Sequence, residues 1–160
     1  MPSLPIAISP NYIDWTPAGC VREFLQNAQD GERKGHRMTV KHFPRTDRLM
    51  VRTDGTILSP SSLVLGNTDK RCDDEAAGHF GEGYKLAVCR LLKLGHEVVI
   101  KNGNENWTPE IRWSDDFQSD ILFFDTHRCC SRDGEAFIEY EISGIIEEIW
   151  TEILKLIRYF

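Results

Sequence analysis

The sequence predicts an α+β domain in which helices cover a largely antiparallel sheet. Three observations support this fold class. Apolar residues recur with helical spacing in three separate segments, at residues 17–30, from residue 83, and over 144–160. Short runs typical of strands separate these segments. With 160 residues, 41% of them hydrophobic, the chain is long enough to bury one core, and we expect a single domain over 1–160.

The first helix is predicted over residues 17–30. Thr16 is an N-cap candidate, Pro17 suits the first helical position, and Gly31 stands where a C-cap is expected. The apolar positions of this segment fall at i, i+4 and i+7, namely Val21, Leu25 and Ala28.

Two further helices show similar signals. One begins at Gly83, and Gly95 is its expected terminator. The other covers residues 144–160 and has an apolar stripe, which we expect to pack on the sheet, with an exposed dimer seam as the less favoured alternative. The stripe consists of Ile146, Ile149, Trp150, Ile153 and Ile157.

Strands are expected between the helices. Residues 38–43 and 47–53 are predicted to form a hairpin, and four strands are expected later, in the runs EVVIKNG, WTPEIRW, DILFFDT and AFIEYEIS. Residues 1–15 carry three prolines among isolated apolar residues, so they are expected to be an extended arm laid on the domain.

The charge balance excludes some classes of function. The 19 Lys and Arg residues against 25 Asp and Glu give a net charge of −6, which offers no overall attraction for nucleic acid or anionic lipid. Direct nucleic-acid binding would therefore need a local patch and is not the expected function. Arg33, Lys34 and Arg37 are interpreted as a solvated turn and not as such a patch. No apolar run reaches the length of a membrane span, so no membrane partner is expected. Five cysteines without a CxxC pair argue against a zinc site or a disulfide framework.

A polar row marks the first helix. Glu23, Asn27 and Asp30 stand at i, i+4 and i+7, which places a carboxylate, an amide and a second carboxylate along one line of the helix. Such a row at the edge of a pocket could hold a hydrated cation, and Mg²⁺ suits it because this ion keeps most of its waters. The alternative is an ordinary solvated helix face.

Two glycine signals follow. Thr53, Asp54 and Gly55 end a predicted strand, and the glycine permits a left-handed turn. The run from Gly78 to Gly83 reads GxxGxG and leads directly into a helix, where exposed backbone amides form a cradle for phosphate oxygens. It is neither a dinucleotide fingerprint, since no strand precedes it, nor a Walker loop, since GK[ST] is absent. A flexible hinge is the alternative interpretation.

The order of these signals resembles the GHKL superfamily, which contains gyrase B, the heat-shock chaperones, histidine kinases and MutL, and it looks closest to MORC-like and to phage or bacterial members. REFLQNAQD is similar to the N box of that family, and RTDGTILSP is similar to its first glycine box. GNTDK at 66–70 resembles the lid motif, and GHFGEGYK resembles the second glycine box.

The resemblance implies a Bergerat fold: a two-layer α/β sandwich with a mixed, mostly antiparallel sheet covered on one face by helices, which binds ATP and Mg²⁺. Carried over to this chain, the resemblance makes Glu23 the general base and Asn27 the protein ligand of the metal. Residues 56–82 would be the ATP lid. The resemblance assigns nucleotide contacts to Asn27, Asp30, Thr53, Asp54, Gly55, Lys70, Gly78, Phe80, Gly81, Glu82, Gly83, Tyr84 and Lys85.

Two departures from the family pattern bear on function. Thr53 stands where the family has its adenine-reading aspartate, so base selectivity stays open, and Asp54 would compensate only if the strand end shifted by one residue. The chain also has no room for the following domain that supplies a phosphate-contacting lysine in gyrase B and MutL. Hydrolysis is therefore expected to be slow or to need a partner.

The resulting hypothesis is a Mg²⁺-dependent ATP-binding module with slow ATPase activity. Nucleotide would order the lid and create a surface for a protein partner or a nucleotide-dependent homodimer. The alternative is a non-hydrolysing protein of the same fold that mimics or regulates a host GHKL or gyrase-type protein. A histidine-kinase-like phosphotransferase is less favoured because no phosphoacceptor helix precedes the domain. The expected location is cytoplasmic, in a bacterium or in the host of a phage.

Overall fold

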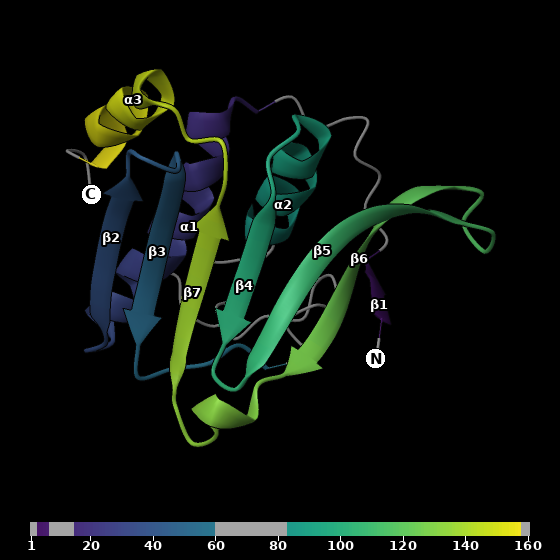
Figure 1. Cartoon of the computed structure of the whole chain (residues 1–160), viewed down its shortest axis with the longest axis horizontal. Helices are drawn as coiled ribbons and strands as arrows, with labels where there is room; N and C mark the ends of the chain where they lie inside the picture. The colour runs from purple at the N-terminus through teal and green to yellow at the C-terminus, as the bar shows by residue number, and fades with distance from the viewer. Residues whose placement is uncertain (1–2, 7–14, 60–82, 158–160) are drawn as a thin grey trace.

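The structure is a computed structural model, and it describes residues 3–6, 15–59 and 83–157. Within these ranges the chain forms one seven-stranded sheet with α-helices on one of its faces (Figure 1). In chain order the elements are β1 (Ser3–Ile6), α1 (Pro17–Arg33), β2 (Arg37–Phe43), β3 (Arg48–Asp54), α2 (Gly83–Lys93), β4 (Val98–Asn102), β5 (Glu105–Ser114), β6 (Ser119–Arg128), the 3-10 turn η4 (Cys130–Arg132), β7 (Phe137–Ile142) and α3 (Glu147–Ile157).

The sheet has the strand order β1-β6-β5-β4-β7-β3-β2, and each pair of neighbours is antiparallel. Helices α1 and α2 lie side by side against one face, and α3 lies near the end of the sheet formed by β2 and β3 (Figure 1). The α+β fold class predicted from the sequence, a sheet covered on one face by helices, is confirmed.

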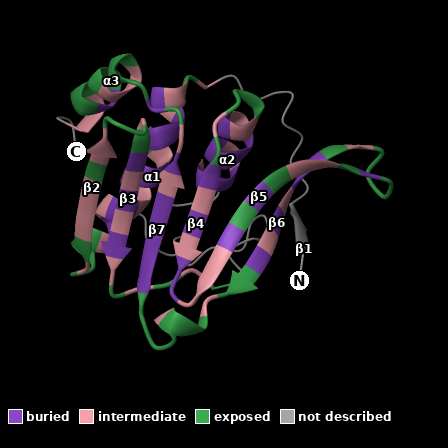
Figure 2. Ribbon diagram, viewed as in Figure 1, coloured by how far each residue is buried: buried purple, intermediate pink, exposed green. Residues whose placement is uncertain are grey.

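The core lies between the helices and the inner face of the sheet. Strand β3 alternates strictly, with Leu49, Val51 and Thr53 buried and the residues between them partly or fully exposed. Helix α1 contributes a wide buried stripe to the same layer (Figure 2). Because alternate residues of a strand face opposite ways, the other face of the sheet carries the polar side chains.

The ends of α1 confirm one expectation and correct another. The side chain of Thr16 accepts a hydrogen bond from the Gly19 backbone N–H at 3.1 Å, as an N-cap does. Gly31 is not the C-cap: the helix continues to Arg33, and Gly35, with φ of 94°, takes the left-handed position after it. Gly31 serves packing instead, since an added Cβ would lie 2.7 Å from Cγ2 of Thr53.

The remaining elements fall close to their expected segments. Helix α2 starts at Gly83, and Gly95 adopts a φ of 91° just after it. Residues 3–6 of the N-terminal segment pair with β6. In α3, Ile153 is buried and the Trp150 ring stacks on His42 at 4.9 Å. Ile146, which the sequence places in the same stripe, lies just before the helix and is 43% exposed. None of the helices described is both long and apolar enough for a bilayer.

Candidate functional site

The polar row of α1 lies where the helix meets two neighbours. Glu23 and Asn27 are half-buried, and Asp30 is only 2% exposed. The row is thus not an ordinary solvated helix face. Its N-terminal end approaches the start of α2, and its C-terminal end approaches β3.

Glu23 contacts Gly83 at the first residue of α2. A Cβ built on Gly83 would collide with Oε2 of Glu23 and lie 2.8 Å from its Cδ. Any side chain at position 83 would therefore displace the carboxylate. This contact brings the acidic end of the α1 row to the end of the glycine-rich run, so the fold joins two of the signals seen in the sequence.

Asn27 reaches the sheet. Its side chain hydrogen-bonds the hydroxyl of Tyr140 on β7. Burial raises the pKa of Tyr140, the nearby Tyr84 adds to that shift, and the hydrogen bond from Asn27 opposes it. The Phe24 ring lies 4.5 Å from the Tyr140 ring and the Tyr84 ring 6.3 Å from it, which fixes this hydroxyl in place.

Thr53 packs against Gly31, the residue that follows Asp30 in α1. Asp30 Oδ1 lies 3.4 Å from Nη1 of Arg33 in the last turn of the helix. Thr53 is 4% exposed and faces α1 from the inner side of β3, so it belongs to the same layer as the polar row. The position that the resemblance assigns to base recognition is therefore on the helix side of the sheet.

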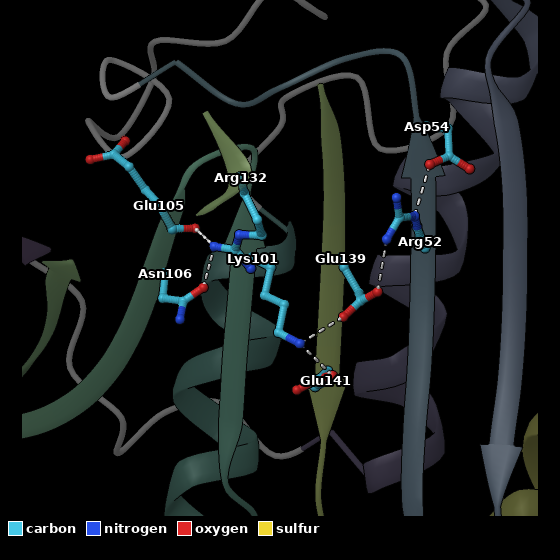
Figure 3. A network of polar contacts seen from close by, with 8 residues as sticks. All are labelled: Arg52, Asp54, Lys101, Glu105, Asn106, Arg132, Glu139 and Glu141. Atoms are coloured by element: carbon cyan, nitrogen blue, oxygen red, sulfur yellow. Dashed lines mark hydrogen bonds and ion pairs between the residues drawn. The ribbon is translucent and has the colours of Figure 1, made fainter. Parts of the chain in front are cut away.

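Asp54 is not brought to this layer. It lies on the outer face, where its carboxylate accepts a hydrogen bond from Nε of Arg52 at 2.8 Å (Figure 3). Strand β3 ends at Asp54 in regular register with β7, so no one-residue shift turns this side chain inward. Gly55 follows with φ of 88°, which agrees with the left-handed turn predicted there.

The second glycine box is described only from Gly83 onward. Tyr84 is 2% exposed and Lys85 is completely buried, with its Nζ 5.8 Å from the centroid of the Tyr84 ring. Both side chains start from the first turn of α2. The other predicted contacts, Lys70, Gly78, Phe80, Gly81 and Glu82, lie outside the described residues, as does most of the expected 56–82 lid.

Two residues near the site escaped the sequence reasoning. Tyr140 reads in the sequence as a core position of an alternating strand. Asn102 is the inward-facing last residue of β4 and is 4% exposed. Its side chain makes two hydrogen bonds of 2.7 Å with the backbone of Leu58, one to the N–H and one to the carbonyl. One signal in the sequence could have found Asn102. It is a polar residue that continues the every-second-residue pattern of the apolar Val98 and Ile100.

The thiol of Cys20 lies one turn before Glu23. Burial raises its pKa to about 12, with the charge of Arg90 on α2 opposing and that of Glu23 adding to the shift. The side chain of Arg90 is anchored by a 2.9 Å hydrogen bond to the carbonyl of Trp15. Cys20 is therefore a neutral packing residue at physiological pH.

Asn27 is the side chain of the row that could hold a Mg²⁺ ion. Among residues 3–6, 15–59 and 83–157, no cluster of three His, Cys, Asp or Glu side chains could hold an ion. A half-buried amide held at a fixed angle by Tyr140 can supply one oxygen, and Mg²⁺ accepts a single protein oxygen with waters and phosphates as its other ligands.

Comparison with solved structures finds a similar fold. The fold of this chain resembles that of the ATPase region of topoisomerase II. The chain matches the ATPase region of Saccharomyces cerevisiae topoisomerase II with a TM-score of 0.51 and 14% identity, over 89% of this chain and 43% of that one. The same region bound to ICRF-187 (dexrazoxane) gives a TM-score of 0.50 and 14% identity, over 88% and 42%.

These values show a likeness of fold to that ATPase region, and at 14% identity the likeness is limited to the fold. The chain spans less than half the length of the matched chains. No family model and no curated protein matches the sequence.

Proposed function

We propose that this chain is a Mg²⁺-dependent ATP-binding module with slow ATPase activity. The observation that carries the proposal is the contact between Glu23 and Gly83. It unites a carboxylate on one helix with the glycine-rich start of another, and a helix start favours phosphate because its backbone N–H groups are not used within the helix.

Glu23 would act as the general base. Its carboxylate would orient a water molecule for attack on the terminal phosphate and accept the proton that this water loses. Asn27 would offer its amide oxygen to Mg²⁺, which neutralises phosphate charge when bound. Tyr140 would hold that amide in position. Thr53 would face the base with a hydroxyl, which accepts and donates hydrogen bonds and so tolerates more than one base.

The proposal extends to the segment between β3 and α2. Nucleotide would order residues 56–82 and create a surface for a protein partner or a second copy. Ordering of a segment by a terminal phosphate is a known switching mechanism. Asn102, bound to the backbone of Leu58, supports this extension because it fixes the point where that segment leaves the sheet.

Titration calorimetry with ATP and MgCl₂, together with a phosphate-release assay, tests the proposal. We expect binding, and we expect Glu23→Ala to lower turnover by about 100-fold or more while nucleotide is retained. Gln29→Ala is the control, since this half-exposed residue lies about 120° around the helix from Glu23. Absence of binding at millimolar ATP would refute the proposal. Binding without any turnover would favour the non-hydrolysing interaction protein instead.

A further inference from the structure

The charges of this acidic chain are segregated along the sequence. Between residues 33 and 52 there are seven Lys or Arg residues and a single acidic one, Asp47. The rest of the chain has twelve Lys or Arg residues against twenty-four Asp or Glu. Such asymmetry is typical of proteins that bind a polyanion through one surface. The basic residues are Arg33, Lys34, Arg37, Lys41, Arg45, Arg48 and Arg52.

The fold gathers most of these charges at one edge of the sheet. Strand β2 is the terminal strand, with only β3 beside it, and none of its residues is buried (Figures 1 and 2). The buried residues of β3 face the helices, so Arg48 and Arg52 project from the outer face. Met50 and Asp54 alternate with the buried residues of β3 and so share this outer face. The register pairs Lys41 with Met50 and Arg37 with Asp54, so both β2 cations lie on the outer face as well.

Five of these cations form no ion pair with the described residues. Arg52 is bound to Asp54 and Glu139 (Figure 3). Arg33 is paired with Asp30. The other five are exposed, and among the described residues none has a carboxylate oxygen within 4 Å. Lys34 lies in the turn that follows α1. We call the four on β2, on β3 and in the turn between them the basic edge: Arg37, Lys41, Arg45 and Arg48.

An aromatic ring positions two members of the basic edge. Nζ of Lys41 lies 5.0 Å and Cζ of Arg48 lies 5.3 Å from the centroid of the Phe43 ring. Cation–π contacts of this kind hold the side chains in place without cancelling their charge. The positive charge is therefore partly preorganised for an anion.

We propose that the basic edge binds the phosphodiester backbone of a nucleic acid. The seven residues of β2 extend over about 20 Å, a length that spans about six phosphates of one strand in a duplex. As the terminal strand, β2 also offers backbone N–H donors on its open side, and such groups commonly contact phosphate. The basic edge would be the local patch that the net charge of the whole chain does not reveal.

Fluorescence anisotropy with a labelled oligonucleotide of about 20 nucleotides, single-stranded or duplex, tests the inference. We expect binding, and we expect the logarithm of the binding constant to fall linearly with the logarithm of the salt concentration. Arg37→Glu/Lys41→Glu should weaken binding about tenfold or more and lower the salt slope by about 1.4 on a single strand or about 1.8 on a duplex. Lys93→Glu/Lys155→Glu changes the net charge equally at exposed sites on α2 and α3, and it should retain near-normal affinity.

Several outcomes would overturn the assignment. They are no binding at low salt, an equal loss in both charge-reversal variants, competitive displacement of the oligonucleotide by ATP, or equally tight binding of a poly-glutamate peptide or an anionic vesicle. Circular dichroism checks that each variant is folded. The milder pair Arg37→Gln/Lys41→Gln provides the same test with less electrostatic disturbance, and it should lower the salt slope by the same amount.

Discussion

The amide of Asn27 hydrogen-bonds the hydroxyl of Tyr140, and this pair ties helix α1 to strand β7 in the middle of the polar row. The ring of Phe24 packs against the Tyr140 ring at 4.5 Å and restricts its movement. The orientation of the proposed metal ligand therefore depends on a strand residue that is not among the proposed nucleotide contacts. Tyr140 is a positioning residue in the proposed site.

Replacing Tyr140 with Phe isolates that role. The aromatic packing is retained while the hydroxyl is lost, so we expect the free energy of unfolding to fall by about 1 kcal/mol. We also expect weaker ATP binding in the presence of Mg²⁺, since Asn27 is no longer held at one angle. Urea unfolding and titration calorimetry with and without Mg²⁺ measure the two effects. An affinity loss of the same size without Mg²⁺ would contradict the positioning role.

Substitution of Gly83 by Ala tests the contact with Glu23. The new Cβ collides with the Glu23 carboxylate, and we expect a loss of about 1–3 kcal/mol in stability together with a loss of nucleotide binding. Removing the obstacle in Glu23→Ala/Gly83→Ala should restore most of the stability. Residues in direct contact give non-additive effects in such a cycle. If the two substitutions are simply additive in thermal unfolding, the contact does not exist in solution.

Replacing Asn102 with Ala should loosen the backbone at Leu58. Both hydrogen bonds of 2.7 Å are lost, and two backbone groups lose their partner, so we expect destabilisation of about 2 kcal/mol. Hydrogen exchange at the Leu58 amide should accelerate. Asn104→Ala is the matched control, because its 3.0 Å hydrogen bond to Asp133 is exposed and contributes little. Equal exchange rates at Leu58 in both variants would show that Asn102 does not hold this segment.

Local signals in the sequence predicted much of the fold. The cap at Thr16 and the turn at Gly55 depend on a few neighbouring residues, and both were predicted correctly. The end of α1 was not, because Gly31 is required by its contact with Thr53 on another element. Tyr140 is a similar case, since the register of β7 and the rotation of α1 together determine that it meets Asn27. Contacts between elements distant in sequence leave no local signal.

The two faces of the sheet illustrate the same limit. Alternation predicts which residues share a face, but only the strand order shows that β2 is at the edge and that its cations join those of β3. Net charge is a sum over the whole chain and carries no information about such segregation. The position of Asp54 on the outer face likewise follows from the register with β7 and not from its neighbours in sequence.

The buried thiol of Cys20 should make stability fall at alkaline pH. Its folded pKa of about 12 lies above that of an unfolded thiol, near 9, so folding favours the neutral form. This contribution is fully present below pH 9 and is lost as the pH rises from 9 toward 12. The free energy of unfolding should decrease in that window by about 1.4 kcal/mol per pH unit for this thiol. Cys89, whose pKa burial raises to about 11, adds a second decrease of the same sign.

Cys20→Ala should therefore show a shallower decrease between pH 9 and 11 than the parent protein in urea unfolding at fixed temperature. Cys130→Ala is the control because that thiol is exposed, and it should keep the parental slope. Comparing slopes and not absolute stabilities removes the constant cost of the small cavity that the alanine leaves. Identical slopes for the parent and Cys20→Ala would mean that the Cys20 thiol is not sequestered from solvent, and the packing of α1 against α2 beside Glu23 would then have to be revised.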